Sequence, residues 1–325
     1  MNETFTTCDV LTFGEAMLRL SPPGRARVEQ ADALALHVAG SESNVAVALC
    51  RMGLRARWLS RLPDDGRGRR VTRSLAAHGV DVSPVVWDAD PAARVGLFFV
   101  EWGAAPRATS VIYDRAGSSA SRLAPGDIGD DLLRSSRHLH VTGITPALSA
   151  SCAAATAHAV AAARRLGKTI SLDVNYRAKL WPPETAAAAL EPLAAQADLL
   201  IASEDDARLL FAAESAEALR ARFPCRAVAV TLTGGGAVMV GEHERAGLRV
   251  DGPPVPEIVD RLGAGDAFAA GLLTGFLEDG DVARGARLGV AMSALKLTMP
   301  GDELFAARAE VESIAAGETV TALRR

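Results

Sequence analysis

The sequence is poor in lysine and in long apolar runs, and each shortage excludes a class of protein. Lys+Arg 35 against Asp+Glu 39 gives a net charge of -4, so there is no basic surplus to hold nucleic acid or an anionic membrane. Only three of the cationic residues are lysines, so an anion site must depend mainly on arginines and backbone amides. No apolar run approaches the ~18 residues of a membrane span. We therefore expect neither a nucleic-acid partner nor a membrane partner.

The cysteines also follow no motif spacing. Cys8, Cys50, Cys152 and Cys225 are scattered without CxxC or Cys/His spacing, which argues against structural zinc, a redox dithiol or a disulfide framework. The opening residues MNETFTTCDV lack the basic start and apolar stretch of a signal peptide. We expect a cytoplasmic protein whose 325 residues, 49% of them hydrophobic, can bury a sizeable core.

Short β-branched runs alternate with longer Ala/Leu-rich stretches along the chain. This alternation predicts an α/β fold with a mostly parallel sheet covered on both faces. One segment breaks it, because 93–102 and 109–115 look like two strands of a hairpin without an intervening helix. We expect a single domain over 1–325, with a small β lid built from about 15–38 and 93–116. The alternating runs include VLTF (10–13), SNVAVALCRM (43–52), AAATAHAVAAARRL (153–166), TISLDV (169–174), DLLIA (198–202) and AVAVTL (227–232).

The most informative segment is VDRLGAGDAFAAGLLTGFL (259–277). Gly263, Ala264 and Gly265 precede an apolar helix, and their backbone amides can converge on an anion at the helix N-terminus. A carboxylate in that turn, Asp266, would repel a phosphate, but it suits a general base that takes a proton from an attacking hydroxyl. The competing interpretation is that Asp266 caps the helix and the glycines make a tight turn.

A second glycine cluster lies in TLTGGGAVMV (231–240). It offers the hydroxyls of Thr231 and Thr233 and the amides of Gly234, Gly235 and Gly236 to a polyphosphate. No GK[ST] follows, so this is not a Walker A loop. The alternative is a glycine turn joining two strands of a hairpin.

Two further segments bring polar side chains to the ends of predicted elements. The strand SLDVNYR (171–177) delivers Asn175 and Arg177 to the carboxyl edge of the sheet, where ligands of open α/β folds bind. Arg177 can hold a carboxylate bidentately, or it is an ordinary surface arginine. In AGSESNVAVAL (39–49), Gly40 precedes a helix whose first turn contains Asn44, which can face a polyhydroxyl ligand. The serines of this segment are explained by helix capping alone.

The predicted lid carries aromatic and cationic side chains on shared strand faces. Tyr113 and Arg115 alternate with Asp114 and so share one face of a strand, and Phe98 and Trp102 likewise share a face of the facing strand. Such a face suits a sugar acid. It equally suits an apolar patch or a contact in a homo-oligomer.

Taken together, these segments resemble the PfkB or ribokinase-like carbohydrate kinases over nearly the whole chain, from FGE (13–15) to MPGD (299–302). DRLGAGDAFAAG is a highly specific match to the second signature of that family. The combination of GSESNVAVAL, HVTGITPALS, SLDVNYRAKLWPPE and LKLTMPGD looks most like the 2-keto-3-deoxygluconate kinases. The resemblance implies a ribokinase-like three-layer α/β/α core with a small β-sheet lid.

The resemblance also implies ATP-dependent phosphorylation of 2-keto-3-deoxygluconate at its terminal 6-hydroxyl, with Mg²⁺ and room for a monovalent cation. Asp266 is then the general base, and the amides of 263–265 form the anion hole. The remaining positions carried over from the family fall into two groups: substrate contacts at Gly40, Asn44, Phe98, Tyr113, Arg115 and Arg177, and nucleotide contacts at Asn175, Thr231, Thr233, Gly234, Gly235 and Gly236.

Three positions depart from the family pattern. Thr231 stands where many relatives carry a lysine, and Phe98 stands where some carry a tyrosine. Ser203 and Asp206 replace an Asn-x-x-Glu motif that affects metal binding, which leaves Asp206 as an indirect metal contact.

Other functions stay open at this point. They are a kinase for another sugar (fructose, ribose or 5-keto-2-deoxygluconate), a dehydrogenase, and a catalytically silent sugar-acid sensor. The dehydrogenase is disfavoured because FGEAML, not GxGxxG, follows the first strand.

Overall fold

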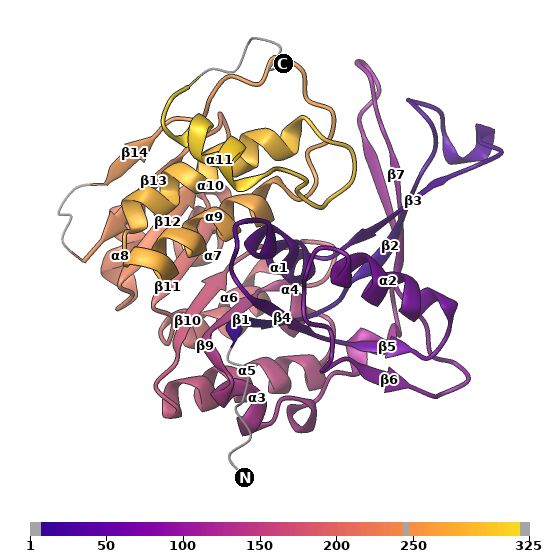
Figure 1. The fold of residues 1–325 in the computed structure, drawn as a ribbon, viewed down its shortest axis with the longest axis horizontal. Coiled ribbons are helices and arrows are strands. Elements are labelled where there is room, and N and C mark those ends of the chain that lie inside the picture. The colour runs from indigo at the N-terminus through magenta and orange to yellow at the C-terminus, as the bar shows by residue number, and fades with distance from the viewer. Residues whose placement is uncertain (1–7, 243–246, 319–325) are drawn as a thin grey trace.

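The chain folds around an eight-stranded sheet that carries helices on both faces (Figure 1), in a computed structural model that describes residues 8–242 and 247–318. Six neighbouring strands, β4 to β12, run parallel, and the last two form an antiparallel edge. The predicted mostly parallel sheet is thus confirmed. In spatial order its strands are β14 (Leu248–Val250), β13 (Ala237–Gly241), β12 (Ala227–Thr231), β11 (Leu199–Ser203), β10 (Thr169–Asp173), β9 (Ser136–Thr142), β1 (Cys8–Phe13) and β4 (Ala56–Leu59).

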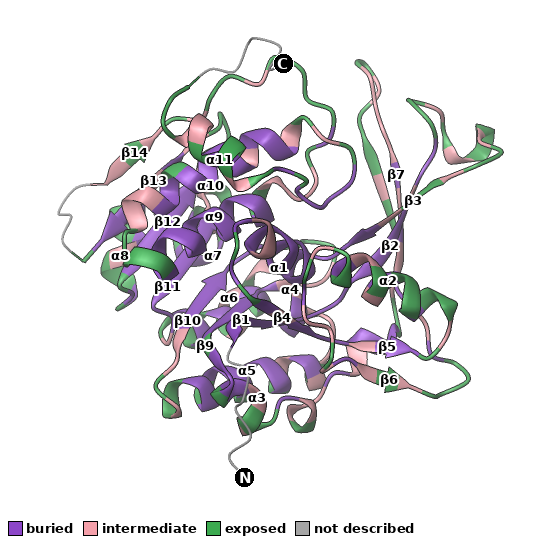
Figure 2. Ribbon diagram, viewed as in Figure 1, coloured by how far each residue is buried: buried purple, intermediate pink, exposed green. Residues whose placement is uncertain are grey.

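The helices form two layers, and the sheet is buried between them (Figure 2). Strand residues alternate between two apolar clusters: Val10 packs with the first helix layer, and its neighbour Leu11 packs with the second. Both faces of a parallel sheet must be covered, so its strands are rich in apolar residues; the buried polar side chains of β9 and β10, among them His138, His140 and Ser171, hydrogen-bond to one another. The first layer contains α1 (Ser41–Arg51), α2 (Gly66–Ala76), α9 (Ala264–Asp279), α10 (Val282–Leu297) and α11 (Arg308–Ala315). The second contains α3 (Asp130–Arg134), α5 (Ala150–Arg165), α6 (Pro183–Ala194), α7 (Glu204–Phe211) and α8 (Ala216–Arg222).

Helix α9 is apolar almost all round because it lies between other elements, with α10 packed closely along it. The close approach depends on glycine. A Cβ on Gly271 would lie 2.4 Å from the backbone nitrogen of Gly289, and one on Gly275 would lie 2.4 Å from that of Gly285. This packing holds the N-terminus of α9 at the carboxyl edge of the sheet.

A second sheet stands apart from the core, at the right of Figure 1. Among the described residues it has four strands in the order β3 (Ala35–Ala39), β2 (Met17–Ser21), β7 (Leu97–Glu101) and β8 (Ser110–Asp114). The expected hairpin is the antiparallel pair β7–β8. The Pro-rich stretch after the first strand supplies β2 and β3, so this sheet joins segments far apart in sequence. Its strands fall within the expected lid, except that β3 extends to Ala39.

The remaining elements are small. Strands β5 (Arg61–Pro63) and β6 (Val86–Asp88) form a parallel pair, and α4 (Ile144–Ala147) is a single turn after β9. Across the described ranges, every helix is too short or too polar to cross a bilayer.

Candidate active site

Asp266 lies in the first turn of α9, and its carboxylate is held by α1. The Ser41 hydroxyl donates to Oδ1 at 2.6 Å, and the Asn44 amide donates to Oδ2 at 2.7 Å. The residue is only 7% exposed. Burial raises the pKa of the Asp266 carboxyl, and the bonds from Ser41 and Asn44 oppose that shift. Asp266 therefore does not cap its own helix: the side chain is aimed at α1 and kept in a fixed rotamer.

The turn before Asp266 requires glycine. Gly263 is the N-cap residue of α9 with φ 83°, a left-handed conformation that costs other residues free energy. A Cβ there would lie 2.0 Å from the carbonyl oxygen of Asp302. The amides of residues 263–265, the predicted anion hole, stand at the positive end of α9. The Ala264 amide donates to the carbonyl of Arg261 at 3.4 Å, whereas the Gly265 amide lies in the first turn, where no carbonyl of the helix can accept its hydrogen bond. The anion hole stays a prediction.

Asn175 adds a second layer to this carboxylate cluster. It follows β10 with φ 41°, and its Nδ2 donates to Ser41 Oγ at 2.8 Å and to Asp173 Oδ2 at 3.2 Å. Burial, together with the charge of Asp266, raises the pKa of Asp173 to about 8. Asn175 thus lies next to the predicted base. Asn175 does not line the cavity that borders the glycine run 234–236. Its predicted contact with nucleotide stays a prediction.

A cavity of about 1220 Å³ lies between β8 of the small sheet and the loop after β10. Tyr113 and Arg115 line it from the sheet, and Arg177 lines it from the loop. Phe98 is buried behind this surface and stacks on the Tyr113 ring at 5.7 Å. The sequence had placed all four near a sugar acid, and the structure brings three of them to one cavity.

The two arginines of this cavity differ in what they already bind. Arg115 forms an ion pair with the buried carboxylate of Glu15, through Nε at 2.7 Å and through Nη2. Arg177 donates to the carbonyl of Tyr176 at 3.0 Å, and across the described ranges it has no carboxylate partner. Arg177 is therefore the guanidinium free to receive an anion.

Lys179 is a residue that sequence reasoning missed. Its Nζ donates to the carbonyl of Val111 on β8 at 2.8 Å and lies 5.4 Å from the Tyr113 ring centre. The contact links the loop after β10 to the small sheet across the cavity. Its position two residues after Arg177 was the only available signal.

The glycine run 234–236 is the turn that joins β12 to β13, as the simpler interpretation had it. It also borders a cavity of about 210 Å³ whose lining includes Thr231, Gly235, Gly236 and Gly265 of the anion-hole turn. Gly236 has φ 91°, and a Cβ there would lie 2.5 Å from the carbonyl oxygen of Val250. Thr233 and Gly234 do not line the cavity.

A larger cavity of about 940 Å³ adjoins it and shares part of its wall, including Gly252, Val255 and Val290. The shared wall is apolar, whereas the inner end carries backbone amides and the Thr231 hydroxyl. An elongated ligand with an apolar ring at one end and an anionic group at the other fits this shape.

No set of three or more metal-binding side chains occurs within the ranges that the structure describes. Asp206 Oδ2 accepts from the Tyr176 amide at 3.3 Å, and burial raises the pKa of its carboxyl. Mg²⁺ commonly binds through one or two carboxylates, waters and substrate phosphates. Asp206 and the neighbouring Asp173 fit that mode.

These features define a sugar kinase. Residues 8–307 match the pfkB family carbohydrate kinases, and the chain belongs to that family. A 2-dehydro-3-deoxygalactonokinase of Haloferax volcanii is 40% identical, over 96% of this chain and 98% of that protein. A 2-dehydro-3-deoxygluconokinase of Bacillus subtilis is 34% identical, over 90% and 91%. The crystal structure of 2-dehydro-3-deoxygluconokinase from Thermotoga maritima superposes with a TM-score of 0.86 at 32% identity, over 95% of this chain and all of that one.

A fourth comparison concerns the fold alone. A putative ribokinase II from E. coli, in complex with ATP and Mg²⁺, matches with a TM-score of 0.86 at 23% identity, covering 95% of this chain and 99% of that one. The predicted ribokinase-like fold and the assignment to the carbohydrate kinases are therefore confirmed.

Proposed function

We propose that this kinase transfers the γ-phosphoryl group of ATP to the terminal hydroxyl of a 2-dehydro-3-deoxyaldonate, with 2-keto-3-deoxygluconate (2-dehydro-3-deoxygluconate) as substrate and Asp266 as general base. One observation carries the proposal. Asp266 directly follows Gly265, which lines the cavity beside the glycine run 234–236. Arg177, which lines the cavity beside the small sheet, is near enough for its charge to lower the pKa of the Asp266 carboxyl. This arrangement supports a base that accepts the proton of a hydroxyl from one cavity while the phosphoryl group comes from the other.

The reaction then uses the residues in fixed roles. The substrate hydroxyl oxygen attacks the γ-phosphorus, its proton goes to Asp266, and the bond from the γ-phosphorus to the bridging oxygen breaks to release ADP. The amides of the 263–265 turn donate to the transferring group, whose charge lies on its equatorial oxygens. Asp206 or Asp173 would hold Mg²⁺, which would supply charge neutralisation for the phosphates. Thr231 leaves that task to the metal and the amides, because this position has no lysine.

The acid end of the substrate is assigned to Arg177. Arg115 is already neutralised by Glu15, so it orients Tyr113, over whose ring its guanidinium lies 5.7 Å from the centre. Gly40 and Asn44 remain the proposed contacts of the sugar chain: Asn44 donates to Asp266, and Gly40 is the N-cap residue of the same helix. Similarity to both a galactonokinase and a gluconokinase supports a 2-dehydro-3-deoxyaldonate as the substrate class, with the two epimers as alternatives.

The test of the base is Asp266→Asn. We expect kcat to fall by about 10² to 10⁴, the range of general-base catalysis, while the affinity for ATP measured by calorimetry stays within about threefold of the parent. Asp279→Asn, at the exposed opposite end of the same helix, is the matched control. Turnover by Asp266→Asn near the parental rate would remove Asp266 from the role of base.

The test of the substrate is an ADP-release screen. It includes both 2-dehydro-3-deoxyaldonate epimers, 5-keto-2-deoxygluconate, fructose and ribose. The proposal requires a 2-dehydro-3-deoxyaldonate to have the highest kcat/KM. Preference for fructose or ribose would show that the acid assignment is wrong.

The setting of the reaction follows from the same proposal. All four cysteines are free thiols, which supports a reducing compartment such as the cytoplasm, where ATP is available. The exposed face of the small sheet either closes over substrate or contacts a second copy of the chain.

A further inference from the structure

Lys296, one of only three lysines, lies wholly inside the protein. It stands in the last turn of α10, is 0% exposed, and its Nζ donates to the carbonyls of Met299 at 3.1 Å and Asp260 at 3.4 Å. Both acceptors are backbone oxygens. The other two lysines, Lys168 and Lys179, each donate to a single carbonyl near the surface. An ammonium is costly to bury, so its position calls for a reason.

The two carbonyls belong to segments that form the anion-hole turn. Asp260 begins the segment that leads into Gly263, and its carboxylate accepts from the Leu262 amide at 2.9 Å and the Gly301 amide at 3.0 Å. Met299 begins the segment that ends at Asp302, whose carbonyl lies against Gly263. Lys296 therefore binds to both segments, 260–263 and 299–302, whose contact sets the shape of the anion-hole turn.

The surrounding charges make this a cationic position. Arg19 Nη1 bonds Asp260 at 2.7 Å and Asp302 at 2.6 Å, and it already occupies both carboxylates. Burial lowers the pKa of the Lys296 ammonium, while the charges of Asp260 and Asp302 oppose that shift. Asp266 acts in the same direction from the active site. The cluster thus balances two cations against two carboxylates directly behind the proposed base.

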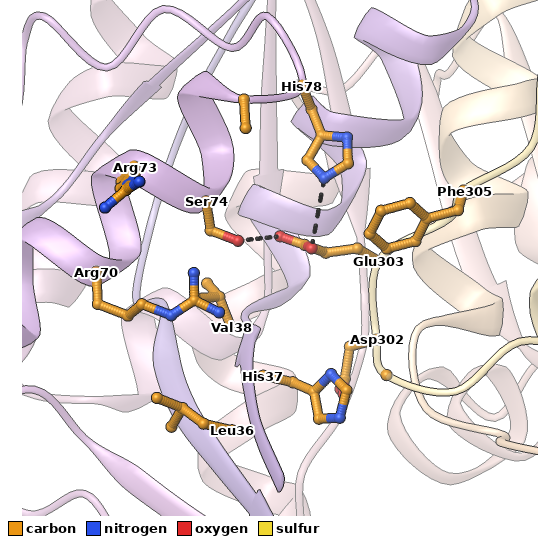
Figure 3. Close-up of a pocket in the computed structure, with 12 residues that line it drawn as sticks. Leu36, His37, Val38, Arg70, Arg73, Ser74, His78, Asp302, Glu303 and Phe305 are labelled. Carbon is orange, nitrogen blue, oxygen red and sulfur yellow. Dashed lines mark hydrogen bonds and ion pairs between the residues drawn. The ribbon is translucent and has the colours of Figure 1, made fainter.

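The outer side of the segment 299–302 borders a cavity. This cavity of about 250 Å³ is lined by residues 301–303 together with His37, Arg70 and His78. Figure 3 shows these lining side chains, with Glu303 directed toward His78. The Glu303 carboxylate lies 3.7 Å from His78 Nε2 within this lining. Because a cavity backs the segment from outside, its position depends on the inner contacts made by Arg19 and Lys296.

We propose that Lys296 is a built-in monovalent cation: its ammonium takes the place of a diffusible ion on the carbonyls of Asp260 and Met299 and holds the anion-hole turn in its active shape. Backbone carbonyls are the ligands that replace the hydration shell of K⁺. A diffusible cation does not fit at these oxygens while Lys296 occupies them. Lys296 is thus a positioning residue, and this kinase is independent of monovalent cations at this position.

The inference rests on the proposed phosphoryl transfer only for its kinetic readout. The experiment compares the parent, Lys296→Met and Lys296→Ala in K⁺, ammonium and tetramethylammonium chloride of equal ionic strength. Kinetics, calorimetric ATP affinity and thermal unfolding are measured for each. Lys168→Met is the matched control, because it also removes an ammonium from a backbone carbonyl but lies far from the site.

We expect the parent and Lys168→Met to have the same kcat and the same unfolding temperature in all three salts. Lys296→Met, which keeps the length of the side chain, is expected to lose about tenfold or more in kcat, the effect of removing a supporting contact. Lys296→Ala, which opens space at the two carbonyls, is expected to lose as much and to regain about fivefold or more in K⁺ or ammonium but not in tetramethylammonium. A merely structural lysine would show no such ion-specific recovery.

Three results would overturn the inference: a parent whose kcat or unfolding temperature rises severalfold or by several degrees in K⁺, a Lys296→Met variant with parental kcat, or a Lys296→Ala variant that recovers equally in all salts. If Lys296→Ala does not fold, the parent and Lys296→Met still decide. If the parent phosphorylates no sugar acid, the proposed substrate is wrong, and the salt dependence of ATP affinity and unfolding tests Lys296 separately.

Discussion

Asp173 is predicted to make this protein less stable as the pH rises. It lies at the carboxyl end of β10, is 7% exposed, and its Oδ2 accepts one long bond from Asn175. Burial and the charge of Asp266 raise its pKa to about 8 from the ordinary 3.8. Between pH 3.8 and about 8 the folded state therefore holds a proton on Asp173 that the unfolded chain has lost. Stability from this group is complete below pH 3.8 and declines until the pH reaches about 8.

The magnitude follows from proton linkage. Between the two pKa values the folded state binds one proton more than the unfolded state, so the free energy of unfolding falls by ~1.36 kcal/mol per pH unit. From pH 5 to pH 7 this is about 2.7 kcal/mol. Relaxation of side chains and entry of water reduce the effect, and we expect about 1 to 2.5 kcal/mol. Asp173→Asn keeps the shape and the Asn175 contact but does not titrate, so it lacks this contribution.

The assay is urea unfolding of the parent and Asp173→Asn at a series of pH values from about 5 to about 8. The stability of the variant relative to the parent should increase steadily over this range. Asp205→Asn, whose side chain is 74% exposed in the first turn of α7, is the control and should follow the parent. A parent and an Asp173→Asn variant with the same pH dependence would refute the reasoning, because Asp173 would then be ionised in the folded protein.

Three further predictions concern the charges and the turn around the site. Arg19→Met leaves two buried carboxylates unpaired and should lower the free energy of unfolding by about 3 to 5 kcal/mol at neutral pH. The loss should be smaller at pH 5, because the pKa of Asp302 is raised to about 6; an equal loss at both pH values would contradict this. Gly263→Ala places a methyl 2.0 Å from a carbonyl oxygen and should lower kcat by about 10² or more, so a rate within about twofold of the parent would show that the turn is not the anion hole. Arg177→Met should raise KM for the sugar acid about tenfold or more, with Arg115→Met affecting KM less; steady-state kinetics with equal KM changes would contradict the distinction.

The sequence predicted those parts of the fold and site that depend on local patterns. Alternation of apolar runs is imposed by a parallel sheet buried on both faces, so the core could be deduced. Asp266 could be singled out because a carboxylate in a glycine-rich turn is chemically unusual. The hairpin of the small sheet could be expected because 93–102 and 109–115 have no helix between them.

The remaining parts depend on contacts between distant residues. Arg115 meets Glu15 100 residues away, and no local pattern distinguishes a paired arginine from a free one. Ser41 was explained by capping, yet its hydroxyl donates to Asp266 from 225 residues away. Lys296 falls in an apolar helix without any sign that its ammonium lies inside. Each of these requires the tertiary structure, because charge partners are chosen in space.

Arg177 connects recognition of the acid to the strength of the base under the proposed function. In the free protein its positive charge lowers the pKa values of both Asp266 and Asp173. A substrate carboxylate that pairs with Arg177 neutralises that charge, so the proton affinity of Asp266 rises when the correct acid is bound. A neutral sugar leaves the guanidinium unpaired and the base weaker. Discrimination between acid and neutral substrates therefore acts on kcat as well as on binding, since one arginine serves both carboxylates.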